Sequence, residues 1–176
     1  MKTIVTTILL FICIKSFSQG GFKINESNQV VWQKIYEDPL INFDDLVSTI
    51  KSNARCSDID VYDDKITFII QDVEPYTKGF SRMSTPFYIL GKFKGFFTID
   101  YKDHRYRITG NKLQVSIPLV NITSQLSTPK YEYTPYEEAV IKKGQFRKDF
   151  ANKYYVLIEN TLDREFKIIK STDDNW

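Results

Sequence analysis

The residue types that most often perform catalysis are sparse in this sequence, and the single histidine, His104, is the first to consider. A nucleophile-and-base site needs a histidine that a third group orients inside a pocket. His104 lies between two runs of strand-forming residues, and this pattern predicts the exposed tip of a hairpin. We therefore interpret it as a turn residue and not as a base. The sequence also contains no glycine-rich phosphate loop and no HExxH, CxxC or GxSxG motif.

Carboxylates offer a second kind of chemistry, and they are dense at Asp58, Asp60, Asp63 and Asp64. Clustered oxygens suit calcium, but this spacing matches no calcium loop, and alternation along a strand separates the side chains. We therefore expect no bound metal and no cofactor. Asp58, Asp60 or Asp100 could instead be the paired carboxylates of a hydrolase acting on envelope polymers. That chemistry needs two carboxyl groups ~5–10 Å apart in a cleft, and it remains the alternative function.

The first 18 residues have the pattern of a secretory leader. A basic start precedes an apolar run over residues 4–14, and Ser16 and Ser18 are small residues before Gln19. The run is shorter than the ~20 residues that span a bilayer. We expect cleavage before Gln19, export to the periplasm or the outside of the cell, and no transmembrane span in the mature protein.

Removal of this leader changes the charge and the cysteine count. It takes away Lys2 and Lys15 and no acid, so the formal side-chain charge falls from +2 to zero. A neutral protein suits neither nucleic-acid phosphates nor anionic lipid, and we expect no nucleic-acid partner. Cys56 is then the single cysteine, and it is predicted to be a small buried residue. With 42% hydrophobic and 15% aromatic residues, residues 19–176 are predicted to form one domain with a sizeable core.

The first part of this domain alternates between strand and helix signals. Residues 29–36 are rich in strand formers, and their apolar positions suggest burial on both sides. Asn42 can cap a helix that runs to about Asn53. A hairpin over residues 58–73 follows, with its turn at Asp63-Asp64. Its expected cross-strand pairs are Ile59 with Phe68 and Val61 with Ile66.

The middle of the chain, residues 96–117, is predicted to be a three-strand antiparallel meander. Its expected turns are Asp103-His104 and Gly110-Asn111, because both dipeptides suit two-residue hairpin loops. Ile99 then faces Ile108, and Ile108 faces Leu113. Because side chains alternate with period two, a shift of one residue would mix the apolar and polar faces.

The remaining segments give weaker signals. Residues 74–94 are predicted to be a long ordered loop or a short extra strand that buries the apolar run 87–90. A capping box with Thr134 as its first residue and Pro135 in the first turn predicts a short helix that Gly144 ends. Helical spacing then continues over residues 146–169, with a possible break at Asn160-Thr161, before a polar tail.

Both hairpins send their polar side chains to one face, and this face is the candidate binding site. One apolar and one polar face indicate an antiparallel sheet that is covered on one side only. The candidate site residues are Asp58, Asp60, Thr98, Asp100, Arg105, Arg107 and Gln114.

Three segments carry a resemblance to a known family: V-x-W-x-K-I-Y-E over residues 30–37, GFFTIDYKDHRYR over residues 95–107, and DDNW at residues 173–176. They resemble a family of secreted Bacteroidota domains of unknown function with a TATA-binding-protein-like (TBP-like) fold. The resemblance implies an α+β fold, in which a curved antiparallel sheet carries helices on one face. It implies no reaction. The chain departs from the family at His104, where relatives have glycine.

Together these features favour a non-enzymatic binding or structural module of the cell envelope, with an unknown polar partner. The open polar face lacks the enclosed, pKa-shifting cleft that a hydrolase needs. A fold name by itself implies no nucleic-acid function. Neither the identity of the partner nor the oligomeric state can be inferred from the sequence.

Overall fold

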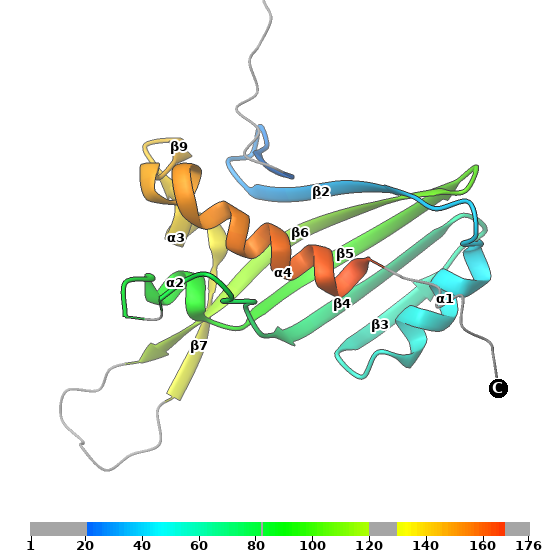
Figure 1. Ribbon diagram of the computed structural model, residues 1–176, viewed down its shortest axis with the longest axis horizontal. Coiled ribbons are helices and arrows are strands. Elements are labelled where there is room, and N and C mark those ends of the chain that lie inside the picture. The colour runs from blue at the N-terminus through cyan, green and yellow to red at the C-terminus, as the bar shows by residue number, and fades with distance from the viewer. Residues whose placement is uncertain (1–20, 82, 120–129, 168–176) are drawn as a thin grey trace, which may run out of the picture.

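The structure is a computed structural model of the chain, and it describes residues 21–81, 83–119 and 130–167. Seven strands form one open antiparallel sheet in the order β1-β2-β6-β5-β4-β3, and β7 pairs with β6 (Figure 1). The strands are β1 (Phe22–Ile24), β2 (Val30–Glu37), β3 (Cys56–Val61), β4 (Lys65–Val73), β5 (Phe93–Lys102), β6 (Arg105–Leu119) and β7 (Lys130–Pro135). The predicted leader, its cleavage point and the polar tail lie outside the described residues.

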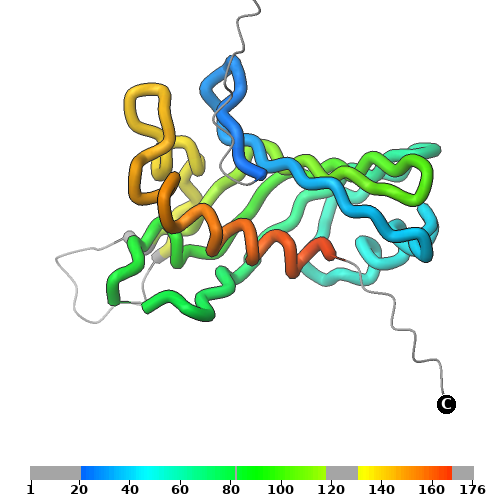
Figure 2. The backbone as a smooth tube through the Cα atoms, turned by 45° about the horizontal axis from the view of Figure 1, so that its top comes forward, coloured from blue at the N-terminus to red at the C-terminus, as the bar shows by residue number. Residues whose placement is uncertain are grey.

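Helices cover one face of this sheet, as Figures 1 and 2 show. They are α1 (Phe43–Ser52), α2 (Phe87–Leu90), α3 (Tyr136–Val140) and α4 (Tyr155–Phe166), the last preceded by a π-helical turn, η1 (Phe150–Tyr154). A small separate hairpin, β8 (Ile141–Lys142) with β9 (Gln145–Phe146), lies between α3 and η1. The fold is therefore α+β, with an antiparallel sheet and helices packed on one face, as the sequence predicts.

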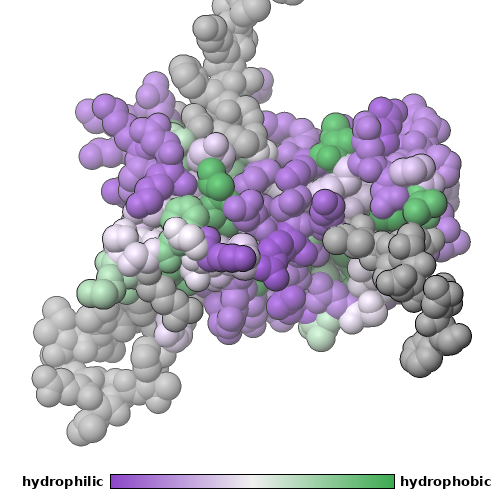
Figure 3. Space-filling model, in the orientation of Figure 1, coloured by the Kyte–Doolittle hydropathy of each residue, from purple (hydrophilic) through white to green (hydrophobic). Residues whose placement is uncertain are grey.

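The core lies between α4 and the sheet. The Phe166 ring lies 5.9 Å from the Trp32 ring and 4.7 Å from the Phe97 ring, centroid to centroid. The face of α4 that points away from the sheet is hydrophilic (Figure 3), as expected for an amphipathic helix on a sheet. At the far edge, Phe43 packs on Tyr101, whose hydroxyl donates to the Ile41 carbonyl.

Several local predictions are confirmed. The Asn42 side chain accepts a hydrogen bond from the Asp45 amide at 2.9 Å, and the Asp45 carboxylate accepts one from the Asn42 amide, so α1 begins with a capping box. Asp103 and His104 both have positive φ, at 50° and 59°, as the predicted two-residue turn requires. The pairs of the β5–β6 hairpin, Ile99 with Ile108 among them, are as predicted.

The third strand of the predicted meander is wrong, because β6 continues straight through Gly110-Asn111. A Cβ atom at Gly110 would lie 2.6 Å from the Phe97 ring, so glycine is needed there for close packing and not for a turn. A bulge follows, with Lys112 at φ 49°, and it returns Leu113 to the core. The neighbour of Ile108 on the other side is consequently Lys34 of β2.

The β3–β4 hairpin is partly as predicted. Val61 pairs with Ile66, but a bulge at Asp58, whose φ is 50°, interrupts the ladder, so Ile59 does not pair with Phe68. The ladder resumes beyond the bulge, where Ser57 pairs with Ile69. Strand β2 confirms the predicted strand, although its second face is buried only at Val31, because Ile35 is 61% exposed.

Two helix boundaries also differ from the prediction. Thr134 belongs to β7 and caps nothing, so α3 begins at Tyr136 and ends at Val140. Gly144 lies instead in the β8–β9 turn, where its φ is 72°. Helix α4 is unbroken at Asn160-Thr161, and the buried Thr161 hydroxyl donates to the Leu157 carbonyl one turn earlier.

Among the described residues of 74–92, the chain forms a loop with one helical turn, α2, and no strand; β5 begins at Phe93. Of the apolar run that was predicted to be buried, Ile89 enters the core, whereas Phe87 is 72% exposed.

Candidate binding surface

The sheet face opposite α4 carries the predicted candidate residues, and none of the helices in the described part of the chain lies over it. We call this surface the open face. Its central members are Gln33, Ile35, Asp60, Lys65, Thr67, Phe96, Thr98, Asp100, Arg107 and Thr109. Their side chains alternate with core residues along each strand, and this alternation places them all on one side.

One row of the open face crosses five strands without interruption. Asp60 pairs with Thr67, Thr67 with Thr98, Thr98 with Thr109, and Thr109 with Gln33. The Gln33 side chain donates to the Thr109 hydroxyl at 3.2 Å. Because neighbouring strands lie ~4.8 Å apart, this polar row is a regular array of hydroxyl and amide groups.

A charged row lies directly beside it. Asp100 accepts two hydrogen bonds from the Arg107 guanidinium, at 2.9 and 3.2 Å, and its other oxygen lies 3.4 Å from Lys65 Nζ. Arg105 reaches Glu37 at 4.0 Å. Both arginine side chains are about half exposed, so each ion pair contributes only ~0.2–1 kcal/mol to stability. These guanidinium groups can therefore be redirected towards a partner at low cost.

The structure brings together most of the predicted residues but not all of them. Asp60, Thr98, Asp100, Arg105 and Arg107 share the open face. The bulge leaves Asp58 without a pairing partner in the ladder. Its carboxylate accepts from the hydroxyl of the neighbouring Ser57 at 3.4 Å.

Gln114 lies on the same side of β6 but beyond the Lys112 bulge, paired with Lys94 and Pro135. It therefore stands apart from the charged row and does not belong to the central cluster.

Sequence reasoning missed Gln33, Lys65 and the apolar members Ile35 and Phe96. Gln33 and Ile35 reach this surface because β2 lies beside β6, and local patterns do not specify that pairing. Residues 30–36 have apolar side chains on both faces of the strand, and we interpreted this pattern as burial on both sides. It was the one sequence feature that placed an apolar side chain, Ile35, on the face opposite Trp32 and Tyr36.

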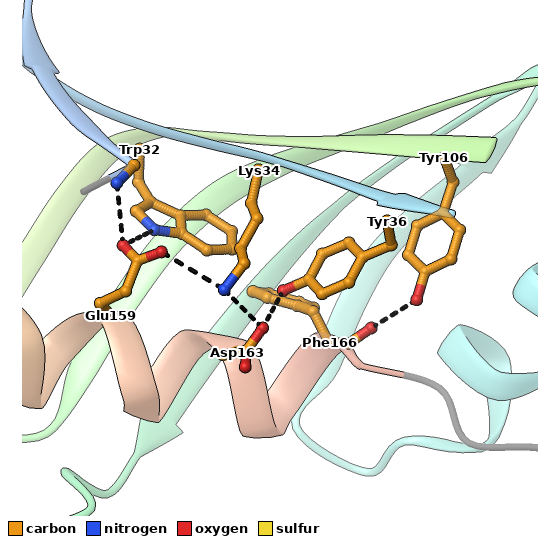
Figure 4. A network of polar contacts seen from close by, with 8 residues as sticks. Trp32, Lys34, Tyr36, Tyr106, Glu159, Asp163 and Phe166 are labelled. Atoms are coloured by element: carbon orange, nitrogen blue, oxygen red, sulfur yellow. Dashed lines mark hydrogen bonds and ion pairs between the residues drawn. The ribbon is translucent and has the colours of Figure 1, made fainter. Parts of the chain in front are cut away.

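A dense polar cluster lies under α4, on the covered face (Figure 4). Glu159 accepts from the Trp32 indole N–H at 2.8 Å and from the Gly21 amide at 3.0 Å, and Lys34 Nζ lies 3.4 Å away. One helical turn later, Asp163 contacts Lys34 Nζ at 2.8 Å. The two carboxylates are one turn apart on α4, so both face β2.

The same cluster continues to the aromatic residues of β2 and β6. The Tyr36 hydroxyl donates to Asp163 at 2.9 Å, and the Tyr106 hydroxyl donates to the Phe166 carbonyl at 3.2 Å (Figure 4). Partial burial acts to raise the pKa of Asp163, but hydrogen bonds from Lys34 and Tyr36 outweigh it and lower that pKa below its ordinary value. These contacts join α4 to β2 and β6, so the cluster fixes α4 to the sheet.

Two further candidates for chemistry are inert in this arrangement. Burial raises the pKa of the half-buried Cys56 thiol to about 11, with a smaller contribution from Glu165, so it is a thiol and not a nucleophilic thiolate at neutral pH. Within residues 21–81, 83–119 and 130–167, no three His, Cys, Asp or Glu side chains are grouped to hold a metal ion. Over the same ranges, no helix is both long and apolar enough to cross a bilayer.

The fold and this surface define a class: an α+β domain whose antiparallel sheet is covered by helices on one face and exposes polar rows on the other. No protein-family model matches the chain, and no curated protein matches it. Among solved structures it is similar to a TBP-like protein from Parabacteroides distasonis, at 16% identity and a TM-score of 0.46, over 78% of this chain and 90% of that one. It is also similar to a DUF4468 family protein from Bacteroides ovatus, at 14% identity and a TM-score of 0.36, over 86% and 94% of the two chains. Neither description names an activity.

Proposed function

We propose that the chain is an exported, non-enzymatic binding module of the cell envelope, whose open face contacts a polar partner. The observation that carries this proposal is the polar row from Asp60 to Gln33, which crosses five strands on a face that no described helix covers. Such a row is not needed for the core. The exposed guanidinium groups of Arg105 and Arg107 supply donors beside it, so the partner must present acceptor oxygens.

The geometry speaks against the alternative, a hydrolase with paired carboxylates. Asp100 is already paired with Arg107 and Lys65 on the exposed sheet face. Asp58 is outside the ladder, and Asp60 is on the edge strand β3. Asp58, Asp60 and Asp100 do not line the pocket between α2, β6 and β7, and glycoside hydrolysis requires two carboxyl groups that face each other across a substrate.

The test removes positive charge from the open face. The mature chain and the double variant Arg105→Ala with Arg107→Ala are immobilised, incubated with envelope extract, and compared by quantitative mass spectrometry. The charge-matched control is Lys142→Ala with Lys148→Ala, which removes two exposed lysines near β8 and η1.

We expect the arginine variant to keep its melting temperature within a few degrees but to lose a partner that the wild type and the control retain. An unchanged partner profile with unchanged folding would exclude the open face as the binding site.

A further inference from the structure

A separate pocket lies at the end of the sheet where α2 approaches β6 and β7. Its volume is about 550 Å³, within the ~300–1,000 Å³ typical of small-molecule sites. Nearly neutral and hydrophobic side chains gather around α2, at the left of Figure 3. The pocket draws its walls from the ends of β4 and β7, from α2, and from the loop that leads into β5. None of its lining residues belongs to the central members of the open face.

The floor of the pocket is held by hydrogen bonds between Lys92 and Ser116. The Lys92 amide donates to the Ser116 hydroxyl at 2.8 Å, and the Ser116 amide donates to the Lys92 carbonyl at 2.9 Å. A Cβ atom at Gly91 would lie 2.0 Å from the Ser116 carbonyl oxygen, so only glycine permits this approach. Because these contacts do not depend on a ligand, the floor is formed in advance.

Two aromatic side chains at the pocket are largely exposed. Phe87 is 72% exposed and Tyr131 is 64% exposed, although both are large and apolar enough to be buried. Tyr133, two residues along β7, points to the same side as Tyr131, and its hydroxyl donates to Asp72 Oδ1 at 2.8 Å. The pocket thus combines a fixed ring with two exposed rings.

Polar groups of both kinds stand among these rings. Asp72 and Glu74 provide acceptors, and Lys92, whose Nζ is 3.8 Å from Glu74, provides donors. A purely apolar ligand would leave these groups without partners. An acidic ligand would face two carboxylates, and a cationic ligand would compete with Lys92 for Glu74 and with Lys94, which lies 5.8 Å over the Tyr133 ring.

We propose that this pocket binds a neutral saccharide unit. A sugar ring has an apolar C–H face that can lie on an exposed aromatic ring, and its hydroxyl groups both donate and accept hydrogen bonds. Tyr131 and Phe87 supply the ring faces, and Asp72, Glu74 and Lys92 supply acceptors and donors around them. The proposal goes beyond the polar-partner function of the open face and does not depend on it.

The test titrates the full chain with soluble oligosaccharides: N,N′-diacetylchitobiose, maltotriose, cellotriose and xylotriose, up to ~10 mM. Binding is followed by saturation-transfer NMR and calorimetry. The variants are Tyr131→Ala and Phe87→Ala, whose exposed side chains can be removed without opening the core. Tyr62→Ala is the matched control, because Tyr62 is 57% exposed at the β3–β4 turn, away from the pocket.

We expect at least one saccharide to bind, about tenfold or more weakening in each pocket variant, and no change in Tyr62→Ala or in Arg105→Ala with Arg107→Ala. Those last two variants separate this site from the open face. No binding by any of the four saccharides, or binding that survives both pocket variants, would overturn the proposal. Tetramethylammonium is titrated in the same way as a cationic probe. Tighter binding of this cation than of every saccharide would also overturn the proposal, in favour of a cation site.

Discussion

Both faces of the sheet carry carboxylates paired with cations, but these pairs have different roles. On the covered face, Glu159 and Asp163 each contact Lys34 and also accept hydrogen bonds from groups that have left bulk water. On the open face, Asp100 also lies between two cations, but those cations are about half exposed. The carboxylates of Asp163 and Asp100 are themselves about equally exposed, at 31% and 29%, so their partners separate the two faces. The covered carboxylates also accept from the Trp32 indole and the Tyr36 hydroxyl and hold α4 to the sheet, whereas the half-exposed cations beside Asp100 are available to a partner.

The largest test of this comparison uses two adjacent aromatic residues. Phe97 is buried between Phe68 and Phe166, whereas Phe96, its neighbour in β5, is half-buried on the open face. Phe97→Ala should lower the free energy of unfolding by ~3–5 kcal/mol, because it empties the centre of the core. Phe96→Ala should cost clearly less, about 1 kcal/mol. Urea denaturation measures both, and equal losses would mean that the open face is itself a packed interface.

The second test compares two carboxylates. Glu159→Ala should destabilise the protein by about 2–3 kcal/mol, because the indole N–H of Trp32 and the Gly21 amide lose their acceptor in a partly buried site. Asp100→Ala should cost ~0.2–1 kcal/mol. Glu138→Ala, which removes an exposed acid from α3, controls for the change in helix composition. A cost for Asp100→Ala equal to that for Glu159→Ala would remove the distinction between the two faces.

The elements that the sequence predicts correctly are those that local chemistry specifies. The Asn42 cap needs only Asp45, three residues away, and the Asp103-His104 turn needs only two residues that tolerate positive φ. The alternation of β5 and the first half of β6 then follows from that turn. Thr98, Asp100 and Arg107 were placed correctly for this reason.

The errors arise where a distant residue decides the local structure. Gly110-Asn111 has the composition of a hairpin turn, but the Phe97 ring occupies the space above Gly110 and the chain continues as a strand. The bulge at Lys112 then imitates the effect of a turn, because it also returns Leu113 to the core. The position of β2 beside β6, and with it Gln33, likewise depends on strand order. The pocket was missed because α2, β4 and β7 meet only in the folded chain.

The third test concerns pH and Asp163 on the covered face. Its pKa is lowered from the ordinary value of 3.8, so its contribution to stability is complete above that value and is lost as the pH falls through the lower folded-state pKa. Asp163→Asn should therefore cost about 1 kcal/mol at neutral pH, since the side chain is partly exposed, and the difference from wild type should vanish in strong acid.

Thermal melts of both proteins from neutral pH to well below 3.8 measure this difference. Asp44→Asn, on the first turn of α1, is the control for removing one acidic group from a helix. A difference between wild type and Asp163→Asn that stays constant with pH would mean that the ionised carboxylate does not carry the contact with Lys34 and Tyr36.

The smallest expected effect concerns the turn that joins β5 and β6, the two strands that contribute most to both faces. His104 has a φ of 59°, and a side chain in this region costs ~1–2 kcal/mol, although glycine loses ~0.5–1 kcal/mol through its freer unfolded state. His104→Gly should therefore raise stability by about 0.5 kcal/mol. The His104 carbonyl, which accepts from the Asp38 amide, is unaffected by the change, and His104→Ala should show no such gain.

His104 belongs neither to the central members of the open face nor to the lining of the pocket. We therefore expect His104→Gly to leave both partner capture by the open face and saccharide binding at the pocket unchanged. Thermal melts of the wild type and the two His104 variants measure the effect on stability. A fall in melting temperature for His104→Gly would show that the imidazole makes a stabilising contact, and that this contact outweighs the cost of holding a side chain at positive φ.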